Sequence, residues 1–397
     1  MHERDTSIDF LLNILKHAIN ARIASRKKPI PKVVLMSATM DTNLFAQYFA
    51  TTHVNGTSTI CPSLSVPGRT FPVIIKYLDT ILPFLERTYS ATDLALLSAD
   101  NKTVSYLGVE QRLEIKVKGS SCITGVPSAK SSSTDQEEIL VPMGLIVTTV
   151  AGICQAGALG AILVFLPGLD DITKCDSWLR EKSPLGLNFD DSKKFKIILL
   201  HSSLPLGQRD VFCPVPRSCR KIILATNIAE TSITLPDIVH VIDTGKVKEK
   251  RYEAFTRVTR LQCTWISKSS ARQRSGRAGR VRNGNYYALY TKSRHELFND
   301  TTTPEMMRSD LQQLCLAVKA HNPEDSIPRF FANCIEPPPH GAVDAAVESL
   351  RVLGALTISE QMTDLGRILA KLPVSPSIGK MMLLGMIFRC FGKSSCN

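Results

Sequence analysis

Short apolar runs rich in valine and isoleucine recur along the chain, and a polar or glycine-containing turn follows each one. Runs of this length and composition are typical of strands buried on both faces. Amphipathic stretches fall between them, at 170–182 and 205–212, and predict helices. This alternation predicts an α/β fold with a parallel sheet covered on both faces. The predicted strands are "KVVLMSAT" (32–39), "AILVFLPG" (161–168), "KIILLHSS" (196–203), "KIILATN" (221–227) and "IVHVIDTG" (238–245).

Two regions depart from this rhythm. Residues 118–138, "KGSSCITGVPSAKSSSTDQEE", are serine-rich and poor in apolar residues, which predicts a disordered insertion. From about residue 304 onward the apolar positions follow a helical period, as in "GAVDAAVESLRVLGAL". The C-terminal part is therefore predicted to be a separate, mainly helical unit.

Composition narrows the class of protein. A length of 397 residues exceeds what one hydrophobic core usually serves, so two or three domains are expected. The net charge of +12 favours partners that carry phosphate, although an ordinary basic surface would give the same count. The 11 cysteines are scattered, without a C-x-x-C pair or zinc spacing, and indicate reduced thiols. No signal peptide or membrane-length apolar run is present, so we expect the cytoplasm or nucleus and no membrane contact.

Small hydroxyl residues or glycine follow each predicted strand. In an open parallel sheet, binding sites form at the carboxyl ends of the strands. Small residues there allow a polyanion to approach the backbone, and hydroxyl groups can bind phosphate oxygens. Any one of these residues is equally well explained as a turn former, but their recurrence favours a site. They are Ser37, Thr39, Gly168, Ser202, Thr226 and Thr244.

The stretch "SARQRSGRAGR" (270–280) adds concentrated positive charge to this picture. Arginine forks match phosphate oxygens in a bidentate way, and Gly276 and Gly279 would let the chain approach an anion closely. A basic cluster is often only solvated surface, so the spacing of its arginines decides whether it indicates a binding site.

That spacing resembles motif VI of superfamily 2 helicases, Q-R-x-G-R-x-G-R, which this chain carries unbroken at 273–280. Further segments resemble motif III ("SAT", 37–39), motif IV ("LVFLPG", 163–168) and motif V ("ATNIAETSITLPDI", 225–238). "LHSSLPLGQRDVF" (200–212) is similar to a segment of the second RecA-like domain of the DEAH-box RNA helicases. Because all five occur in that family's order, the chain is identified as a member.

The resemblance implies a partial first RecA-like lobe, a complete second lobe, a mainly helical winged-helix domain and part of a ratchet domain. Residues 245–266 correspond to a β-hairpin that helps separate strands in this family. The implied boundaries are 1–75 for the end of the first lobe, 76–300 for the second lobe, 301–370 for the winged helix and 371–397 for the start of the ratchet.

The motif positions also imply roles in nucleotide binding. Arg277 and Arg280 would be the arginine fingers on the γ-phosphate of ATP, and Gln273 would order the attacking water. Phe212 would stack on adenine, whereas Asp237 would contact the ribose and Gly276 would lie beside the nucleotide.

A second set of residues is implied to contact RNA. Thr226, Ser202, Thr231 and Ser232 would touch the RNA backbone, which is the same at every nucleotide and carries little sequence information. Ser37 and Thr39 would couple hydrolysis to domain closure.

The N-terminus resembles only the second half of motif II, Asp-Glu-x-His followed by Glu-Arg. The chain begins "MHER", so His2 takes the place of the motif histidine, and the residues that hold Mg²⁺ and polarise water are expected before residue 1. A Walker A loop is absent too, since the "GKS" at 392–394 has its nearest upstream glycine, Gly385, two positions too far away. The ligands of ATP and Mg²⁺ are thus expected mainly outside this chain.

Three interpretations remain open at this stage. The first is a fragment of an ATP-dependent RNA helicase, cut at both ends, with protein partners bound through the missing flanking domains. The second is a catalytically inactive paralogue that retains RNA binding. The third is the same architecture acting on DNA. For the isolated chain we expect no ATPase activity.

Overall fold

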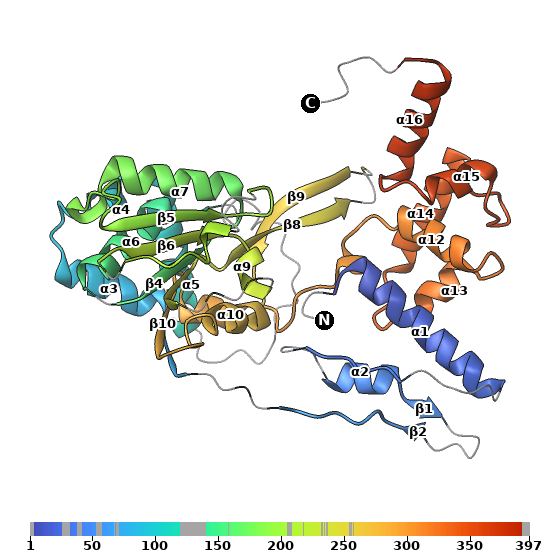
Figure 1. Ribbon diagram of the computed structural model, residues 1–397, viewed down its shortest axis with the longest axis horizontal. Helices are drawn as coiled ribbons and strands as arrows, with labels where there is room; N and C mark the ends of the chain where they lie inside the picture. Colours follow the sequence, from blue (N-terminus) through green and yellow to red (C-terminus); the bar gives the residue numbers. More distant parts are fainter. Residues whose placement is uncertain are drawn as a thin grey trace. The chain divides into compact units, whose positions relative to one another are not determined.

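The structure is a computed structural model in which the chain divides into two compact units. Unit 1 comprises 1–65, 250–261 and 303–397, and unit 2 comprises 66–249 and 262–302 (Figure 1). Each unit is treated by itself below. The structure describes residues 4–25, 32–37, 42–52, 58–66, 68, 71–119, 140–157, 159–204, 209–216, 218–231, 233, 235, 237–253, 256 and 258–390.

Unit 2 is built on a six-stranded sheet in which all neighbouring strands run parallel. The four predicted strands from 161 onward are confirmed, and the sheet adds β3 and β10, whose short, partly polar sequences had given no clear signal. In spatial order the strands are β3 (Val73–Lys76), β10 (Gly284–Ala288), β7 (Ile238–Asp243), β4 (Ala161–Phe165), β6 (Arg220–Ala225) and β5 (Phe195–Leu200).

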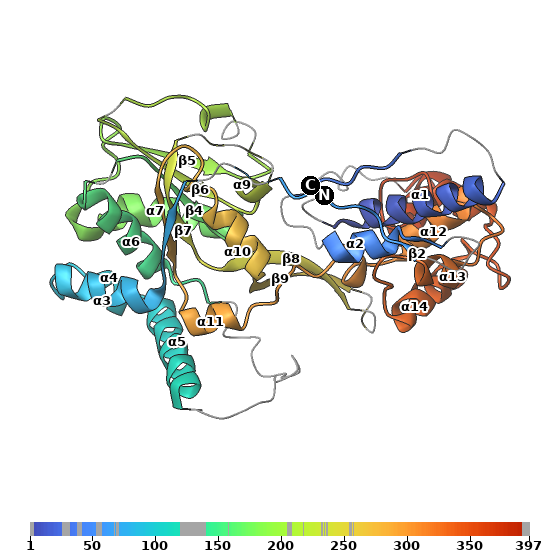
Figure 2. The same cartoon turned by 90° about the horizontal axis from the view of Figure 1, so that it is seen from below.

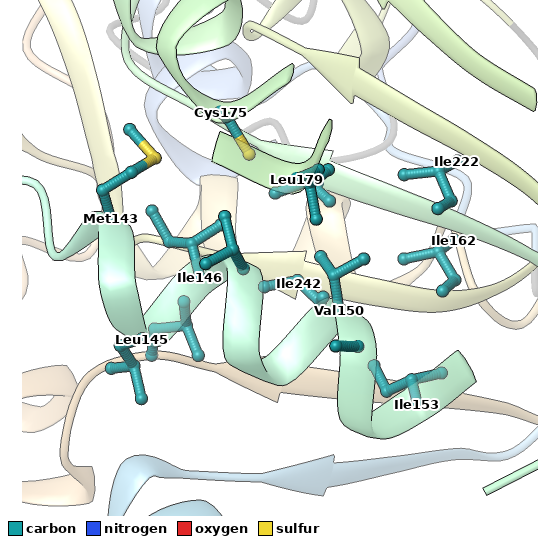
Figure 3. Packing of buried hydrophobic residues seen from close by; sticks show 14 of the residues in the cluster. Met143, Leu145, Ile146, Val150, Ile153, Ile162, Cys175, Leu179, Ile222 and Ile242 are labelled. Carbon is teal, nitrogen blue, oxygen red and sulfur yellow. The ribbon is translucent and has the colours of Figure 1, made fainter. Parts of the chain in front are cut away.

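Helices cover both faces of this sheet, as the alternating pattern predicts. Helix α6 is buried from Met143 to Ile153, because apolar residues surround it and it lies between the sheet and its neighbours. Figure 3 shows α6 packing against isoleucines of three central strands. Figure 2 shows α6 on one side of the sheet and α10 on the other. The first face carries α3 (Leu78–Thr88), α4 (Ala95–Ala99), α5 (Asn101–Gly119), α6 (Met143–Gln155) and α7 (Leu169–Lys182), and the second carries α9 (Ile228–Thr231) and α10 (Lys268–Ser275).

The hairpin predicted at 245–266 is present as a two-stranded sheet of β8 (Lys246–Glu253) and β9 (Val258–Trp265). Its tip belongs to unit 1, where the Tyr252 amide donates to the carbonyl of Arg308 at 2.8 Å. The short helix α11 (Lys292–Glu296) follows β10 in unit 2.

The C-terminal part of unit 1 is helical, as its period predicts. Its helices share one core, and Gly354 ends α14 in the left-handed conformation that glycine adopts without strain. An isolated bridge joins Leu356 to Met362 after that turn. The elements are the 3₁₀ turn η2 (Glu305–Met307), α12 (Gln312–His321), α13 (Ile327–Ala332), α14 (His340–Leu353), α15 (Asp364–Leu369) and α16 (Pro376–Ile387).

The N-terminal segment packs against these helices within unit 1. It contains α1 (Thr6–Ala24), α2 (Thr42–Tyr48) and two-residue strands at 51–52 and 58–59. The buried Asn13 donates from Nδ2 to the carbonyl of Phe330 at 2.8 Å. This contact explains why a polar residue is tolerated on the buried face of α1.

The strand predicted at 32–39 was wrong for its described part. Residues 32–37 have no regular structure, and the side chains of Val34 and Met36 are largely exposed. Among the residues that the structure places, no strand pairs with this run, and an isolated strand lacks the hydrogen bonds that would stabilise it.

The contact division places β3 in unit 2, because Val73–Lys76 pairs in register with β10. The predicted domain boundary after residue 75 therefore runs through this strand. The serine-rich insertion, apart from its first two residues at the end of α5, and the "GKS" at 392–394 lie outside the described residues. Across the described part of the chain, no helix is both long and apolar enough to cross a membrane.

Candidate functional site

The arginine-rich stretch begins on α10 and continues into the turn behind it. Ser267 caps the helix by accepting from the Ser270 amide at 3.1 Å, and Gln273 lies half-buried on its last turn. A Cβ on Gly279 would lie 2.5 Å from the carbonyl oxygen of Phe71. Glycine is thus required here for packing against the chain that enters β3.

Arg274 is the most buried arginine of this stretch, with 1% of its surface exposed. Its Nε lies 2.9 Å from Oε2 of Glu230 on α9, and its Nη1 lies 2.8 Å from Oδ1 of Asp243 at the end of β7. Burial alone would lower the pKa of Arg274, but these two carboxylates raise it above the ordinary value. This side chain therefore ties α10 to motif V and to the central strand.

Both carboxylate oxygens of Asp243 accept hydrogen bonds. Besides Arg274, Oδ1 accepts from the Gly245 amide at 2.8 Å, and Oδ2 accepts from the hydroxyl of Tyr286 at 2.6 Å. The Tyr286 hydroxyl is in turn 2.8 Å from that of Tyr290. A fully connected buried network of this kind fixes the positions of its members.

Arg277 lies only three residues beyond Arg274, but it differs from Arg274 in its partners. It is 8% exposed, and the one described hydrogen bond of its side chain runs from Nη1 to the carbonyl of Ile233 at 3.0 Å. Burial and, to a smaller extent, Arg280 lower its pKa to about 10 against an opposing effect of Glu230, and burial also lowers the pKa of Arg280. Within the part of the chain that the structure describes, neither guanidinium has a carboxylate in salt-bridge range, and both could accept an anionic ligand.

Phe212 and Asp237, both predicted to contact nucleotide, come together at the amino edge of the sheet. Asp237 directly precedes β7, and its Oδ2 lies 2.8 Å from Nζ of Lys221. The same Nζ donates to the carbonyl of Val211 at 2.9 Å, which fixes the segment next to Phe212. The ring of Phe212 is 55% exposed and is available for stacking.

Ser202 and Thr226, both predicted to contact RNA, lie at the opposite, carboxyl edge. Ser202 is exposed directly after β5, and Thr226 is buried directly after β6. At the same edge, a Cβ on Gly168 would meet Nζ of Lys248 at 2.6 Å, so the hairpin lies against the end of β4. The two predicted sets therefore occupy opposite edges of one sheet.

The remaining predicted residues are only partly visible. Thr231 ends α9, and its side chain is not described, whereas Ser37 ends the irregular run at 32–37. Gly276 caps α10 in a right-handed conformation. His2, Thr39 and Ser232 lie outside the described residues.

Sequence reasoning missed the network around Arg274. All four arginines of the stretch 270–280 had been interpreted as one charged cluster, although Arg274 is structural. A signal was available in Asp243, since a carboxylate at the end of the fully apolar run "IVHVID" needs a buried cationic or hydrogen-bonding partner.

Comparison with known families agrees with this architecture. Residues 148–282 match the family described as "Helicase conserved C-terminal domain", and residues 346–374 match "Helicase associated domain (HA2), winged-helix". The parallel sheet with its motifs defines a RecA-like helicase domain followed by a winged helix. The chain belongs to the DEAH/DExH-box RNA helicases.

Several relatives align with 98% of the chain. The DExH-box ATP-dependent RNA helicase DExH1 of Arabidopsis thaliana is 39% identical over 402 residues, which are 38% of its length. The ATP-dependent DNA/RNA helicase DHX36 of Homo sapiens is 35% identical, with 38% of its length covered. The chloroplastic DExH4 of Arabidopsis thaliana is 37% identical, with 27% covered. The chain spans about a third of the length of these relatives. One of them is named as chloroplastic, so the cytoplasm or nucleus stays a prediction for this chain.

Proposed function

We propose that this chain is the second RecA-like domain and adjoining helical unit of an ATP-dependent helicase that moves along and unwinds RNA. In this proposal Arg277 and Arg280 stabilise the charge on the phosphates of ATP. Phe212 stacks on the base, Asp237 contacts the ribose, and Gln273 orders the attacking water. ATP and its Mg²⁺ supply the phosphoryl chemistry, while these side chains bind and orient the nucleotide.

Arg277 carries most of this proposal. A buried guanidinium without a carboxylate partner among the described residues costs folding free energy unless an anion binds it. Arg274 shows that the same motif places a compensated arginine where only structure is needed. Glu230 compensates the charge of Arg277 only in part and without a salt bridge, so a ligand is the best explanation of the remaining charge, and phosphate is the anion that fits an arginine fork.

The carboxyl edge supports the nucleic-acid part of the proposal. Ser202 and Thr226 follow adjacent parallel strands at the carboxyl edge of the sheet. Small hydroxyls at such an edge are suited to a phosphodiester backbone. Binding of RNA by the isolated chain should weaken as salt rises, because phosphate contacts release counterions.

A chimaera tests the catalytic part. The segment of Arabidopsis DExH1 that aligns with this chain would be replaced by residues 1–397, and RNA-stimulated ATPase activity measured. We expect activity in the chimaera and a loss of ~10³–10⁵-fold in its Arg277→Ala and Arg280→Ala variants. Arg112→Gln, on the exposed side of α5, is the control and should leave the rate unchanged.

Measuring RNA binding beside ATPase activity distinguishes the active helicase from the inactive paralogue that retains RNA binding. A chimaera that binds RNA with a steep salt dependence but never hydrolyses ATP would favour the inactive, RNA-binding alternative. Turnover that survives Arg277→Ala would contradict the proposed role of that arginine.

DNA is a second candidate substrate, because some aligned relatives are named DNA/RNA helicases. Contacts to the sugar-phosphate backbone alone would not distinguish the two polymers strongly. Competition between RNA and DNA oligomers of equal sequence, measured with the chimaera, decides between them.

A further inference from the structure

Lys221 is a buried lysine at the amino end of β6. Its side chain is 3% exposed, and the four residues that follow it in the strand are fully buried and apolar. Because side chains alternate along a strand, Lys221 shares a face of the sheet with Ile223, which belongs to the core on the α10 side. A lysine is rarely buried to this extent unless its ammonium group is paired, so the partners of Lys221 indicate what it does.

Two segments that are distant in the sequence meet at this ammonium group. Nζ of Lys221 lies 2.8 Å from Oδ2 of Asp237, the residue directly before β7. The same Nζ donates to the carbonyl of Val211, directly before Phe212, at 2.9 Å. Both distances are those of well-formed hydrogen bonds from a charged donor. One side chain of β6 thus holds both the aspartate and the chain that carries the phenylalanine.

On the first side, Lys221 fixes the main chain next to Phe212. Val211 is fully buried in the same core as Ile223, whereas Phe212 is 55% exposed. The Phe212 amide donates to the carbonyl of Arg209 at 3.2 Å, which closes the turn around Val211. The exposed phenylalanine ring is therefore carried by a backbone whose neighbouring residue is anchored in the core.

On the second side, Lys221 fixes one oxygen of Asp237. The aspartate side chain is 38% exposed although its partner is buried, so a ligand can reach it. Its Oδ1 has no hydrogen-bond partner among the residues that the structure places, and a covered acceptor without a donor costs free energy. The Asp237 carbonyl accepts from the Ala161 amide at 3.0 Å, which holds the main chain of the aspartate against β4. Asp237 is thus fixed at its main chain and at one oxygen, and the hydroxyl of a ligand would supply the missing donor.

A second buried lysine shows what a purely local role requires. Lys319 on α12 is also 3% exposed, and its Nζ donates to the carbonyls of Pro323 and Asp325 at 3.0 and 2.7 Å. Both acceptors belong to the loop after α12, so this lysine closes a single loop. Lys221 differs because one of its partners is a carboxylate and because it joins two loops. Each of those loops carries a residue that is assigned to the nucleotide above.

We propose that Lys221 is a positioning residue for the nucleoside part of ATP. It holds Asp237, the ribose acceptor, and the backbone of Phe212, the stacking residue, in a fixed relation to each other without touching the nucleotide itself. The inference rests on the proposed function above and deepens it, because it divides the site into two parts. Recognition of base and ribose depends on Lys221, whereas recognition of the phosphates depends on Arg277 and Arg280.

The test compares ATP with inorganic tripolyphosphate, which lacks the base and the ribose. Equilibrium binding of each ligand with Mg²⁺ is measured by calorimetry on the chimaera described above, so no turnover is required. We expect Lys221→Met to weaken ATP binding at least about tenfold and to change tripolyphosphate binding less than about twofold. Lys194→Met is the matched control and should change neither affinity, because Lys194 lies at the same edge, directly before β5, but is exposed.

Lys221→Gln provides a second variant in case the methionine variant does not fold. Its amide can still donate to the carbonyl of Val211 but cannot neutralise Asp237, so the selective loss of ATP affinity should persist. Retained tripolyphosphate binding shows that either variant is folded. In RNA-stimulated ATPase assays, both variants should raise the KM for ATP and leave kcat within about threefold, because the arginines still hold the phosphates.

The outcomes separate this inference from the proposed function. ATP binding that Arg277→Ala weakens but both Lys221 variants leave intact would overturn the role of Lys221 alone. An equal loss of both ligands in the lysine variants would mean that Lys221 only supports the fold, and would overturn its proposed role as well. Selective loss of ATP in the lysine variants, with no effect of Arg277→Ala on either ligand, would support Lys221 and contradict the role of the arginine. A chimaera that binds no ATP would overturn both.

Discussion

Arg274 and Asp243 form an ion pair from which water is almost completely excluded, with Nη1 of the arginine 2.8 Å from Oδ1 of the aspartate. Arg277, three residues further on in the turn after α10, is nearly as buried, but the described hydrogen bond of its guanidinium goes only to a backbone carbonyl. One short motif thus contains an arginine whose charge is paired with two buried carboxylates and another that has no salt bridge among the described residues.

Arg274→Met should destabilise the chain severely. The substitution leaves Asp243 and Glu230 buried without their cationic partner, and breaking a buried pair in this way costs about 3–5 kcal/mol. The free energy of unfolding in urea measures the effect. Arg272→Met is the control, because Arg272 is exposed on the same helix and should change the free energy by less than about 0.5 kcal/mol. Equal effects of the two substitutions would show that the network contributes nothing specific.

Arg277→Met should leave the chain as stable as before or make it more stable. Burial lowers the pKa of Arg277 to about 10, so the folded state disfavours its charge at every pH below that value. The penalty is present at pH 7 and declines only as the pH rises through about 10. Thermal unfolding at pH 7 tests this expectation. A loss comparable to that of Arg274→Met would mean that Arg277 is a structural residue after all.

The sequence identified the class of fold better than it identified the roles of single residues. Four buried strands were recognised because parallel strands carry long apolar runs, whereas β3 and β10 escaped because they are short and mix polar with apolar residues. Motif spacing located Arg277 and Arg280, but charge alone could not distinguish them from Arg274. That distinction depends on Glu230 and Asp243, which only the tertiary structure brings together.

The two glycines of the motif should differ in their tolerance of alanine. At Gly279 a Cβ would lie 2.5 Å from the carbonyl oxygen of Phe71 and 2.7 Å from Val73, so β3 would have to move. At Gly276 the nearest atom is the carbonyl oxygen of Arg272 at 3.3 Å, which a small adjustment can relieve. We expect Gly279→Ala to cost roughly 1–3 kcal/mol, and Gly276→Ala under about 1 kcal/mol. The reverse order in thermal unfolding would contradict the proposed packing of β3 against this turn.

In unit 1, Arg4→Met should destabilise the packing of the N-terminal segment. Arg4 holds the carboxylate of Asp9 with two hydrogen bonds, at 3.1 and 2.9 Å, and also contacts Glu336. Because Asp9 is buried, loss of the arginine should cost roughly 3 kcal/mol. The exposed pair of Arg367 and Asp364 provides a matched control, and Arg367→Met should cost about 0–1 kcal/mol. Urea unfolding of both variants makes the comparison, and equal costs would refute a special role for Arg4.

His240 should make the chain less stable as the medium becomes acidic. Its pKa is about 4 in the folded state and about 6.5 when unfolded, so the unfolded chain takes up the proton first as the pH falls. The stabilisation is complete above about pH 6.5 and is lost between pH 6.5 and 4, with a total on the order of 3 kcal/mol. His240→Gln removes this titration, and its free energy of unfolding should approach that of the unmodified chain as the pH falls across this window. Parallel curves for the two proteins would show that His240 titrates normally.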